Sequence, residues 1–155
     1  MPTTFGLQVK GFDKVQQLIV QHERQLKPDQ ENIVEVGFTQ TYALIVHEDM
    51  EMNHEVGQAK YLEQPSRVGK EMIGKVIATT ISKGGSIQQG LEAGGRVLEV
   101  LAKELTPVDT GALRLSTYVA PESSADEAAK SAFERSEAHR LAVLAQRQKE
   151  RDNKP

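Results

Sequence analysis

Apolar side chains between residues 66 and 105 recur every three or four positions, with one interruption at Lys83-Gly84-Gly85. This spacing is typical of helices that bury one face, whereas a half-buried strand would show a period of two. The pattern therefore predicts two consecutive helices, at about 66–83 and 86–105. Their apolar positions are Val68, Met72, Ile73, Val76, Ile77 and Ile81 in the first helix, and Leu91, Leu98, Leu101 and Leu105 in the second.

Serine and glycine residues add detail to this helical pair. Ser66 and Ser86 stand at the predicted starts, where a serine hydroxyl can accept a hydrogen bond from a free backbone N–H. Gly90, Gly94 and Gly95 each weaken a helix by about 0.5–1 kcal/mol relative to alanine, so they need a structural reason. We interpret them as points of close helix–helix approach. A phosphate-binding loop would instead place its glycines between a strand and a helix, next to a lysine.

Three other stretches alternate apolar and polar residues, which is the period of a half-buried strand. They cover residues 4–9, 31–38 and 113–119, and the first contains Phe5, Leu7 and Val9. Residues 12–26 show helical spacing, and the apolar segment 41–48 fits a strand or a helix equally well. Together the patterns predict an α/β (α+β) fold, in which three or four strands form a small antiparallel or mixed sheet packed with long helices.

The C-terminal segment differs in composition from the rest of the chain. Only 38% of all residues are apolar and 5% are aromatic, which is low for one compact globule. Residues 125–151 are rich in the helix formers Ala, Glu, Arg, Lys and Gln, but their large apolar residues are few. We therefore expect a domain at 1–120 and a C-terminal helical extension at 121–155, which docks on a partner chain. Charges expected to set its register there include Glu134, Arg135, Glu137, Arg140 and Arg147.

Charge and composition make several classes of protein improbable. The formal net charge is −3, whereas a protein that neutralises many phosphates is expected to be basic. There are no cysteines, which excludes disulfides, thiolate nucleophiles and cysteine-ligated zinc. No apolar run reaches the ~20 residues of a membrane span, and the first residues lack the basic and apolar regions of a signal peptide. We therefore expect a soluble protein of a cytoplasm, with no membrane partner.

Residues 47–67 are polar without a clear period and predict a long loop, of the kind that is often functional. Six of them, His47, Glu48, Asp49, Glu51, His54 and Glu55, offer two imidazoles and four carboxylates. A metal-dependent enzyme is therefore an alternative interpretation. The histidines are seven positions apart, however, not four as in a metalloprotease helix. We prefer a polar loop that contacts neighbouring chains, and we expect no catalytic residues and no metal.

The segment from Pro107 to Gly111 predicts a turn after the second long helix. Pro107 lacks a backbone donor and ends the helix. Asp109 or Thr110 can hydrogen-bond the turn backbone, and Gly111 can adopt a positive φ. We expect a structural turn that starts the 113–119 strand, with Arg114 beside it as a candidate for an ion pair between subunits.

Four segments, in this order, resemble a known family. They are Gly11-Phe12-Asp13-Lys14, Tyr42-Ala43 with Val46-His47-Glu48, GQAKYLEQP from Gly57 to Pro65, and PVDTGALRLS from Pro107 to Ser116. The order is similar to that in head–tail joining or tail-completion proteins of tailed bacteriophages, also described as neck or minor tail proteins. The likeness covers about residues 4–120. PVDTGALR is its most specific part, and the extension 121–155 is less typical.

The resemblance implies a fold, a function and partners. The family has a small α/β core with a strongly bent sheet and long helices, and its members form rings at the neck of the virion. The resemblance therefore implies a structural protein without catalytic residues or cofactors, which is assembled in the host cytoplasm. The partners would be further copies in a hexamer or dodecamer, a portal or adaptor protein, and a tail-tube or tail-terminator protein. Genomic DNA would pass through the channel without specific binding.

Ring contacts are heterologous, so each chain must present two different surfaces. We expect the 47–65 loop and the C-terminal helix to supply them. The candidate interface residues are His47, Glu48, Tyr61, Leu62, Arg67, Arg114, Phe133, Leu141 and Leu144. Alanine at Tyr61 and Leu62 is predicted to impair assembly and to leave the monomer folded.

Overall fold

The computed structural model describes residues 32–154, and the predictions for residues 4–9 and 12–26 lie outside this part. The elements are β1 (Val34–Phe38), α2 (Ala43–Glu48), α3 (Glu63–Val68), α4 (Lys70–Ser82), α5 (Ile87–Leu105), α6 (Ala112–Leu115), β2 (Thr117–Pro121), the 3₁₀ turn η1 (Glu122–Ser124) and α7 (Ala125–Asp152). The predicted α+β class is confirmed. Within the described residues the sheet has two strands, which pair antiparallel with Val36 opposite Val119.

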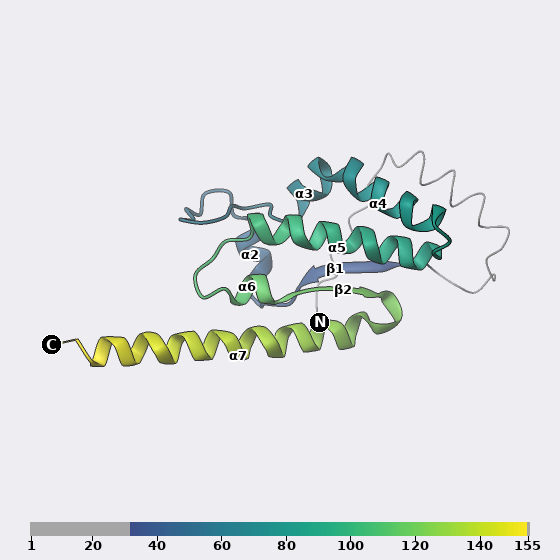
Figure 1. The fold of residues 1–155 in the computed structure, drawn as a ribbon. Helices are drawn as coiled ribbons and strands as arrows, with labels where there is room; N and C mark the ends of the chain where they lie inside the picture. Colours follow the sequence, from purple (N-terminus) through teal and green to yellow (C-terminus); the bar gives the residue numbers. More distant parts are fainter. Residues whose placement is uncertain (1–31, 155) are drawn as a thin grey trace.

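The elements stack in layers (Figure 1). α4 packs on α5, α5 covers one face of the β1–β2 sheet, and α7 runs along the opposite face. Alternate residues of a strand point to opposite faces. Val34 and Val36 accordingly contact α5 near Gly95, whereas Glu35 and Gly37 belong to the other face.

The α4–α5 pair confirms the strongest sequence prediction. Ser86 caps α5 in a reciprocal capping box with Gln89. Ile73, Ile77, Ile81 and Ile87 form a buried cluster between the two helices. A Cβ on Gly94 would lie 2.6 Å from Ile77 Cγ1, so the predicted close approach of helices is confirmed there. It is wrong for Gly95, which lies against Val119 of the sheet, because α5 is packed on two sides.

The start of the first predicted helix is also different. Ser66 does not cap a helix but lies buried within α3, where its hydroxyl donates to the carbonyl of Glu63 at 2.7 Å. Gly69 separates α3 from α4, and a Cβ there would lie 2.5 Å from Leu101 Cδ1. The helical stretch therefore begins at Glu63, before the first residue of its apolar stripe, and α3 gives way to α4 at Gly69, beside Leu101 of α5. The ambiguous segment 41–48 contains the helix α2.

The predicted strand 113–119 is only half right. Residues 112–115 form the short helix α6, and β2 begins at Thr117. Hydrogen bonds from Leu115 N to Gly111 O and from Ser116 N to Ala112 O close the helical turn. Leu113 and Leu115 are two positions apart, which fits a strand, but burial of Ala112 and Leu113 against the domain favours the helix.

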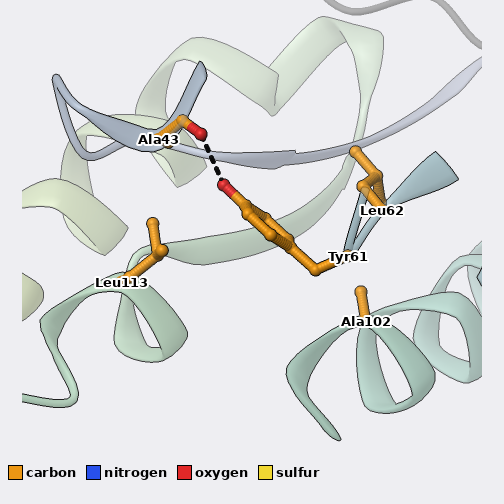
Figure 2. Packing of buried hydrophobic residues seen from close by; sticks show 5 residues of the cluster. All are labelled: Ala43, Tyr61, Leu62, Ala102 and Leu113. Carbon is orange, nitrogen blue, oxygen red and sulfur yellow. Dashed lines mark hydrogen bonds between the residues drawn. The ribbon is translucent and has the colours of Figure 1, made fainter. Parts of the chain in front are cut away.

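A second buried cluster lies at the other end of α5. It joins Ala43, Tyr61, Leu62, Ala102 and Leu113, which come from four separate segments of the chain (Figure 2). Thr106, at the end of α5, is also fully buried, and its hydroxyl donates to Ala102 O at 2.7 Å. This cluster joins the loop, the turn and the helices into one body.

The C-terminal helix is confirmed, and part of it belongs to the main body. Ala125, Ala132 and Ser136 are buried against the sheet and α6. The C-terminal end of α7 extends beyond the other elements (Figure 1). The predicted extension at 121–155 therefore begins as a layer of the domain and becomes a projecting helix only further along.

Candidate functional site

The motif segments that were separated in the sequence meet around Tyr61. Its side chain is 1% exposed, and its hydroxyl donates to the carbonyl of Ala43 at 2.7 Å (Figure 2). Its ring meets Phe38 and His47 edge-on, with centroids 4.8 and 5.0 Å apart. Burial raises the pKa of the Tyr61 phenol, so it stays a neutral donor. Tyr61 is therefore a core residue of this chain.

This burial bears on three of the predicted interface residues. His47 is 6% exposed, Tyr61 1% and Leu62 7%. Their side chains are occupied by contacts within the domain, so the predicted contact with a neighbour does not fit them. Alanine at Tyr61 and Leu62 would remove core packing and destabilise the monomer, contrary to the prediction that it stays folded.

His47 positions the start of α3. Its carbonyl accepts from Lys60 N at 2.8 Å, and its Nε2 lies 3.3 Å from the backbone N–H of Glu63. Its Nδ1 is 2.7 Å from Glu48 Oε1. A neutral ring that donates from Nδ1 to Glu48 and accepts at Nε2 from Glu63 satisfies both contacts. The VHE motif thus has a structural use that its spacing did not reveal.

A row of alternating charges lies on the surface above this core. We call Glu48, Lys60, Glu63 and Arg67 the charged row. Lys60 pairs with Glu48 and, at 3.2 Å, with Glu63, which in turn pairs with Arg67. The hydrogen bond from Lys60, followed by that from His47, lowers the pKa of Glu48, and the same contact with Glu48 raises the pKa of Lys60. Both shifts favour the charged forms of Glu48 and Lys60, so this pair stays ionised near neutral pH.

The backbone of Lys60 is in the left-handed region, with φ of 55°. This conformation costs a residue with a Cβ about 1–2 kcal/mol. The hydrogen bond to His47 O and the ion pairs hold it in place. The turn at Lys60 thus lies directly between α2 and α3, and its amine belongs to the charged row.

Gly57 brings the loop onto the end of α5. Its φ is +87°, and a Cβ there would lie 2.5 Å from the backbone nitrogen of Pro107. On either side, Gln58 N donates to Leu105 O at 2.9 Å and Val108 N donates to Val56 O at 3.3 Å. The GQAKYLE and PVDTG motifs are therefore joined directly, at a point where only glycine fits.

A hollow of about 580 Å³ opens beside the charged row, and we call it the motif hollow. Its lining includes Met50, Met52, His54, Lys60 and Arg67. His54 Nε2 is buried and has no hydrogen-bond partner among the described residues. Two of its lining residues are exposed large apolar side chains, Met50 at 72% and Met52 at 39%.

The alternative metal site has no ligand set in the described part of the chain. There, no group of three or more His, Cys, Asp or Glu side chains is placed to hold an ion. His47 pairs with Glu48, and Asp49 Oδ1 instead accepts from the backbone N–H groups of Glu51 and Met52 at 2.9 and 3.2 Å. The 47–55 cluster thus comprises the last two residues of α2, which the sequence had placed in a loop, and the irregular segment that follows it.

The PVDTG segment has the predicted turn geometry. α5 ends at Leu105, two residues before Pro107. Gly111 has φ of +86°, and Thr110 Oγ1 accepts from Ala112 N at 3.3 Å. The sequence did not predict the contacts that α7 makes with this turn. Arg147 of α7 donates to Asp109 Oδ1 at 2.8 Å and to its carbonyl at 2.9 Å, and His139 Nε2 lies 2.9 Å from Thr110 O.

The other predicted interface residues have mixed surroundings. Arg114 donates to the carbonyl of Thr106 at 3.2 Å, so it ties α6 to the end of α5. Phe133 and Leu144 are each 37% exposed and Leu141 is 59% exposed. The charges of α7 are partly used within the chain, since Glu137 accepts from Gln40 at 2.8 Å and pairs with Arg140. Leu141 is the most exposed of the large apolar residues on this helix.

Within the described residues, no helix combines the length and the apolar character needed to cross a membrane. Comparison with protein-family models, with curated proteins and with solved structures finds no match for this chain.

Proposed function

We propose that this chain is a structural, non-catalytic virion protein that forms a ring at the neck of a tailed bacteriophage and joins the DNA-filled head to the tail. One observation carries the proposal. Ala43, Tyr61 and Leu113 come from the three described segments that resemble this family, and they share one buried cluster. Segments that belong to one family fold are expected to pack together, whereas chance sequence similarities scattered along a chain are not.

The motif hollow is the surface we assign to a neighbouring subunit or neck protein. Contiguous exposed apolar side chains mark interaction sites, and methionine and arginine are enriched in interfaces. Met50, Met52 and Arg67 line this hollow. A neighbour that covers it would also supply a partner for His54 Nε2, whose burial without a hydrogen bond is unfavourable.

The second surface of a heterologous ring contact is assigned to the exposed side of α7. Leu141 is exposed there, between the His139 and Arg147 contacts that hold the helix to the turn. In the proposed assembly the neighbours are further copies, a portal or adaptor protein on the head side, and a tail-tube or tail-terminator protein on the other. DNA passes through the ring without specific binding.

Assembly can be tested on the purified full chain. Met50→Asp with Met52→Asp places two charges on the lining of the motif hollow, and we expect loss of the ring in native mass spectrometry and negative-stain images. Val100→Asp is the matched control, since Val100 is 56% exposed on α5. Retention of rings in the double variant would contradict the assigned surface.

The location can be tested independently on particles from a strain that carries the gene. Immunogold labelling with antibodies against this chain should mark the junction of head and tail. Purified virions that lack the protein would refute the proposed function. The metal-enzyme alternative has no ligand set in the described part of the chain, so we propose no second function.

A further inference from the structure

The outer side of α7 carries a short stripe of exposed residues. Residues three or four positions apart share one face of a helix. Four exposed residues of α7 have this spacing, and we call them the α7 stripe: Leu141, Leu144, Ala145 and Gln148. A helix that docks in a groove of another protein uses anchors at i, i+3, i+4 and i+7, which is the spacing of this stripe.

The α7 stripe and the motif hollow do not meet within one chain. Among the described residues, none from α7 lines the hollow. His139 and Arg147 bind a different side of α7 to the turn at Thr110 and Asp109. Figure 1 shows α7 running clear of the loop between α2 and α3. A contact between the stripe and a motif hollow therefore requires two copies of the chain.

The loop that borders the motif hollow is acidic. Between the end of α2 and Ala59 the chain has no Lys or Arg, whereas it has Glu48, Asp49, Glu51 and Glu55. Glu51 and Glu55 are exposed and form no salt bridge within the part of the chain that the structure describes. Their neighbours in sequence, Met52 and His54, line the hollow, so the two carboxylates stand at its border.

Lys149 places the opposite charge beside the α7 stripe. It follows Gln148, is exposed, and has no salt bridge to any described residue. The carboxylates that follow it accept hydrogen bonds within the same helix, Glu150 from Gln146 and Asp152 from Gln148. Opposite charges across an interface steer association and fix its register. The two surfaces are thus complementary in both apolar character and charge.

We propose that α7 of one copy docks in the motif hollow of the next copy. Leu141 and Leu144 lie against Met50 and Met52 of that copy, and the Lys149 ammonium lies among the carboxylates at the border. The inference rests on the proposed function, because it names the partner of the motif hollow within the ring. The contact joins two different surfaces, so it repeats in one direction from copy to copy and can close into a ring.

The apolar part of the contact can be tested by sedimentation velocity on the purified full chain. Leu141→Asp should weaken association of copies by about tenfold or more, because it places a charge in the centre of the contact. Ala142→Asp is the matched control, since Ala142 is exposed at the next position but lies outside the stripe. Leu141 is 59% exposed, so the variant should stay folded. Equal weakening in the two variants, or none in either, would overturn the placement.

The charged part can be tested by reversal and rescue. Lys149→Glu should weaken association about tenfold in low salt and less in high salt, and so should Glu51→Lys with Glu55→Lys. All three changes together in one chain should restore most of the loss. Lys75→Glu, which is exposed on α4, is the control and should have little effect. A combined variant that associates no better than its parents would overturn the pairing.

Crosslinking identifies the two surfaces that meet. The natural chain has no cysteine, so single introduced cysteines are unique. A mixture of Met52→Cys and Leu144→Cys chains should give a covalent heterodimer through a short bismaleimide, and each chain alone should give little. Dimers of Leu144→Cys alone would show that α7 pairs with α7 and would overturn the inference. Rings of the natural chain without the mixed crosslink would overturn the inference alone, whereas a natural chain that stays monomeric would overturn the proposed ring as well.

Discussion

The two long helices of this protein are attached to the same sheet by different means. α5, of 19 residues, buries Ile87, Gly90 and Gly94 against α4 and buries Ala102 in the cluster around Tyr61. α7, of 28 residues, buries only Ala125, Ala132 and Ser136 on the opposite face. Most of its specific contacts are polar. They include Gln40 to Ser136 at 2.8 Å, Arg135 to Leu115 O at 3.0 Å, and Arg147 to Asp109.

This difference predicts two kinds of stability in one domain. Apolar contact is non-directional and scales with the area removed from water. Each net hydrogen bond contributes about 0.5–1.5 kcal/mol, and exposed ion pairs weaken further with salt. α5 should therefore unfold only with the whole domain, whereas α7 should loosen earlier and respond to salt and pH.

The largest expected effect is in the α4–α5 layer. Ile77→Ala removes a side chain that is 5% exposed and packs against Gly94. We expect it to lower the free energy of unfolding by about 2–5 kcal/mol in urea titrations. Val100→Ala on the exposed side of α5 is the control and should change stability by less than about 0.5 kcal/mol. Similar losses in both variants would show that burial does not distinguish the two sides of α5.

The second largest loss of stability is expected at the turn around Gly111, which α7 contacts. Gly111→Ala places a side chain at φ of +86°, which we expect to cost about 1–2 kcal/mol in the same titration. The added Cβ would also lie 3.4 Å from His139 Nε2. Gly84→Ala is a sharp control, because Gly84 has φ of +93° with nothing within 4 Å. Any loss beyond that of the control measures the contact with α7, and no loss at all would contradict the turn geometry.

A smaller effect is expected where the projecting part of α7 meets the turn. Arg147→Ala removes the exposed pair with Asp109, which should contribute about 0–1 kcal/mol and fade at high salt. Hydrogen exchange near residue 147 should rise in low salt, while the amides of α5 stay protected. Arg151→Ala, whose side chain contacts Gln148 on the same helix, should have no such effect. An equal change in the two variants would mean that the pair does not hold the helix.

The smallest effect is a pH dependence confined to α7. Hydrogen bonds from Arg140 and then from Gln40 lower the pKa of Glu137 below its usual 4.5. The charged form is therefore favoured by folding, and its stabilisation is complete above the unfolded pKa and lost as the pH falls through the lowered folded value. Thermal unfolding between pH 2 and 6 should show a shallower slope in Glu137→Gln than in the natural chain. An unchanged slope would exclude this carboxylate as a source.

Most features of α5 and of its packing on α4 could be predicted from the sequence. The three-and-four spacing, the Ser86 cap and Gly94 each act locally or between neighbours in the chain, so their pattern is visible in one dimension. Local signals failed at Ser66, which is buried within α3 instead of capping a helix, and at 113–115, where a contact from elsewhere in the chain decided the outcome. Leu113 is buried with Tyr61, and that contact outweighs its alternation with Leu115.

The candidate site was predictable as a set of segments but not as an arrangement. His47, Tyr61 and Leu62 stand in a polar stretch, so we expected them on the surface, and the structure buries them. Gly57 carried a usable signal, since an isolated glycine in a motif often marks close backbone approach. The contacts from His139 and Arg147 to the turn had no sequence signal, because each spans about thirty or more residues between exposed polar groups.

Periodicity, capping and backbone geometry within a few residues were enough to predict the helical pair, the α+β class, the turn at Gly111 and the helix at the C-terminus. Tertiary structure alone decided which polar-looking residues form the core, which face of α5 meets the sheet, and how far α7 belongs to the domain. The physical reason is that burial and hydrogen-bond partners depend on segments far apart in the chain, and only their packing in space brings Ala43, Tyr61 and Leu113 together.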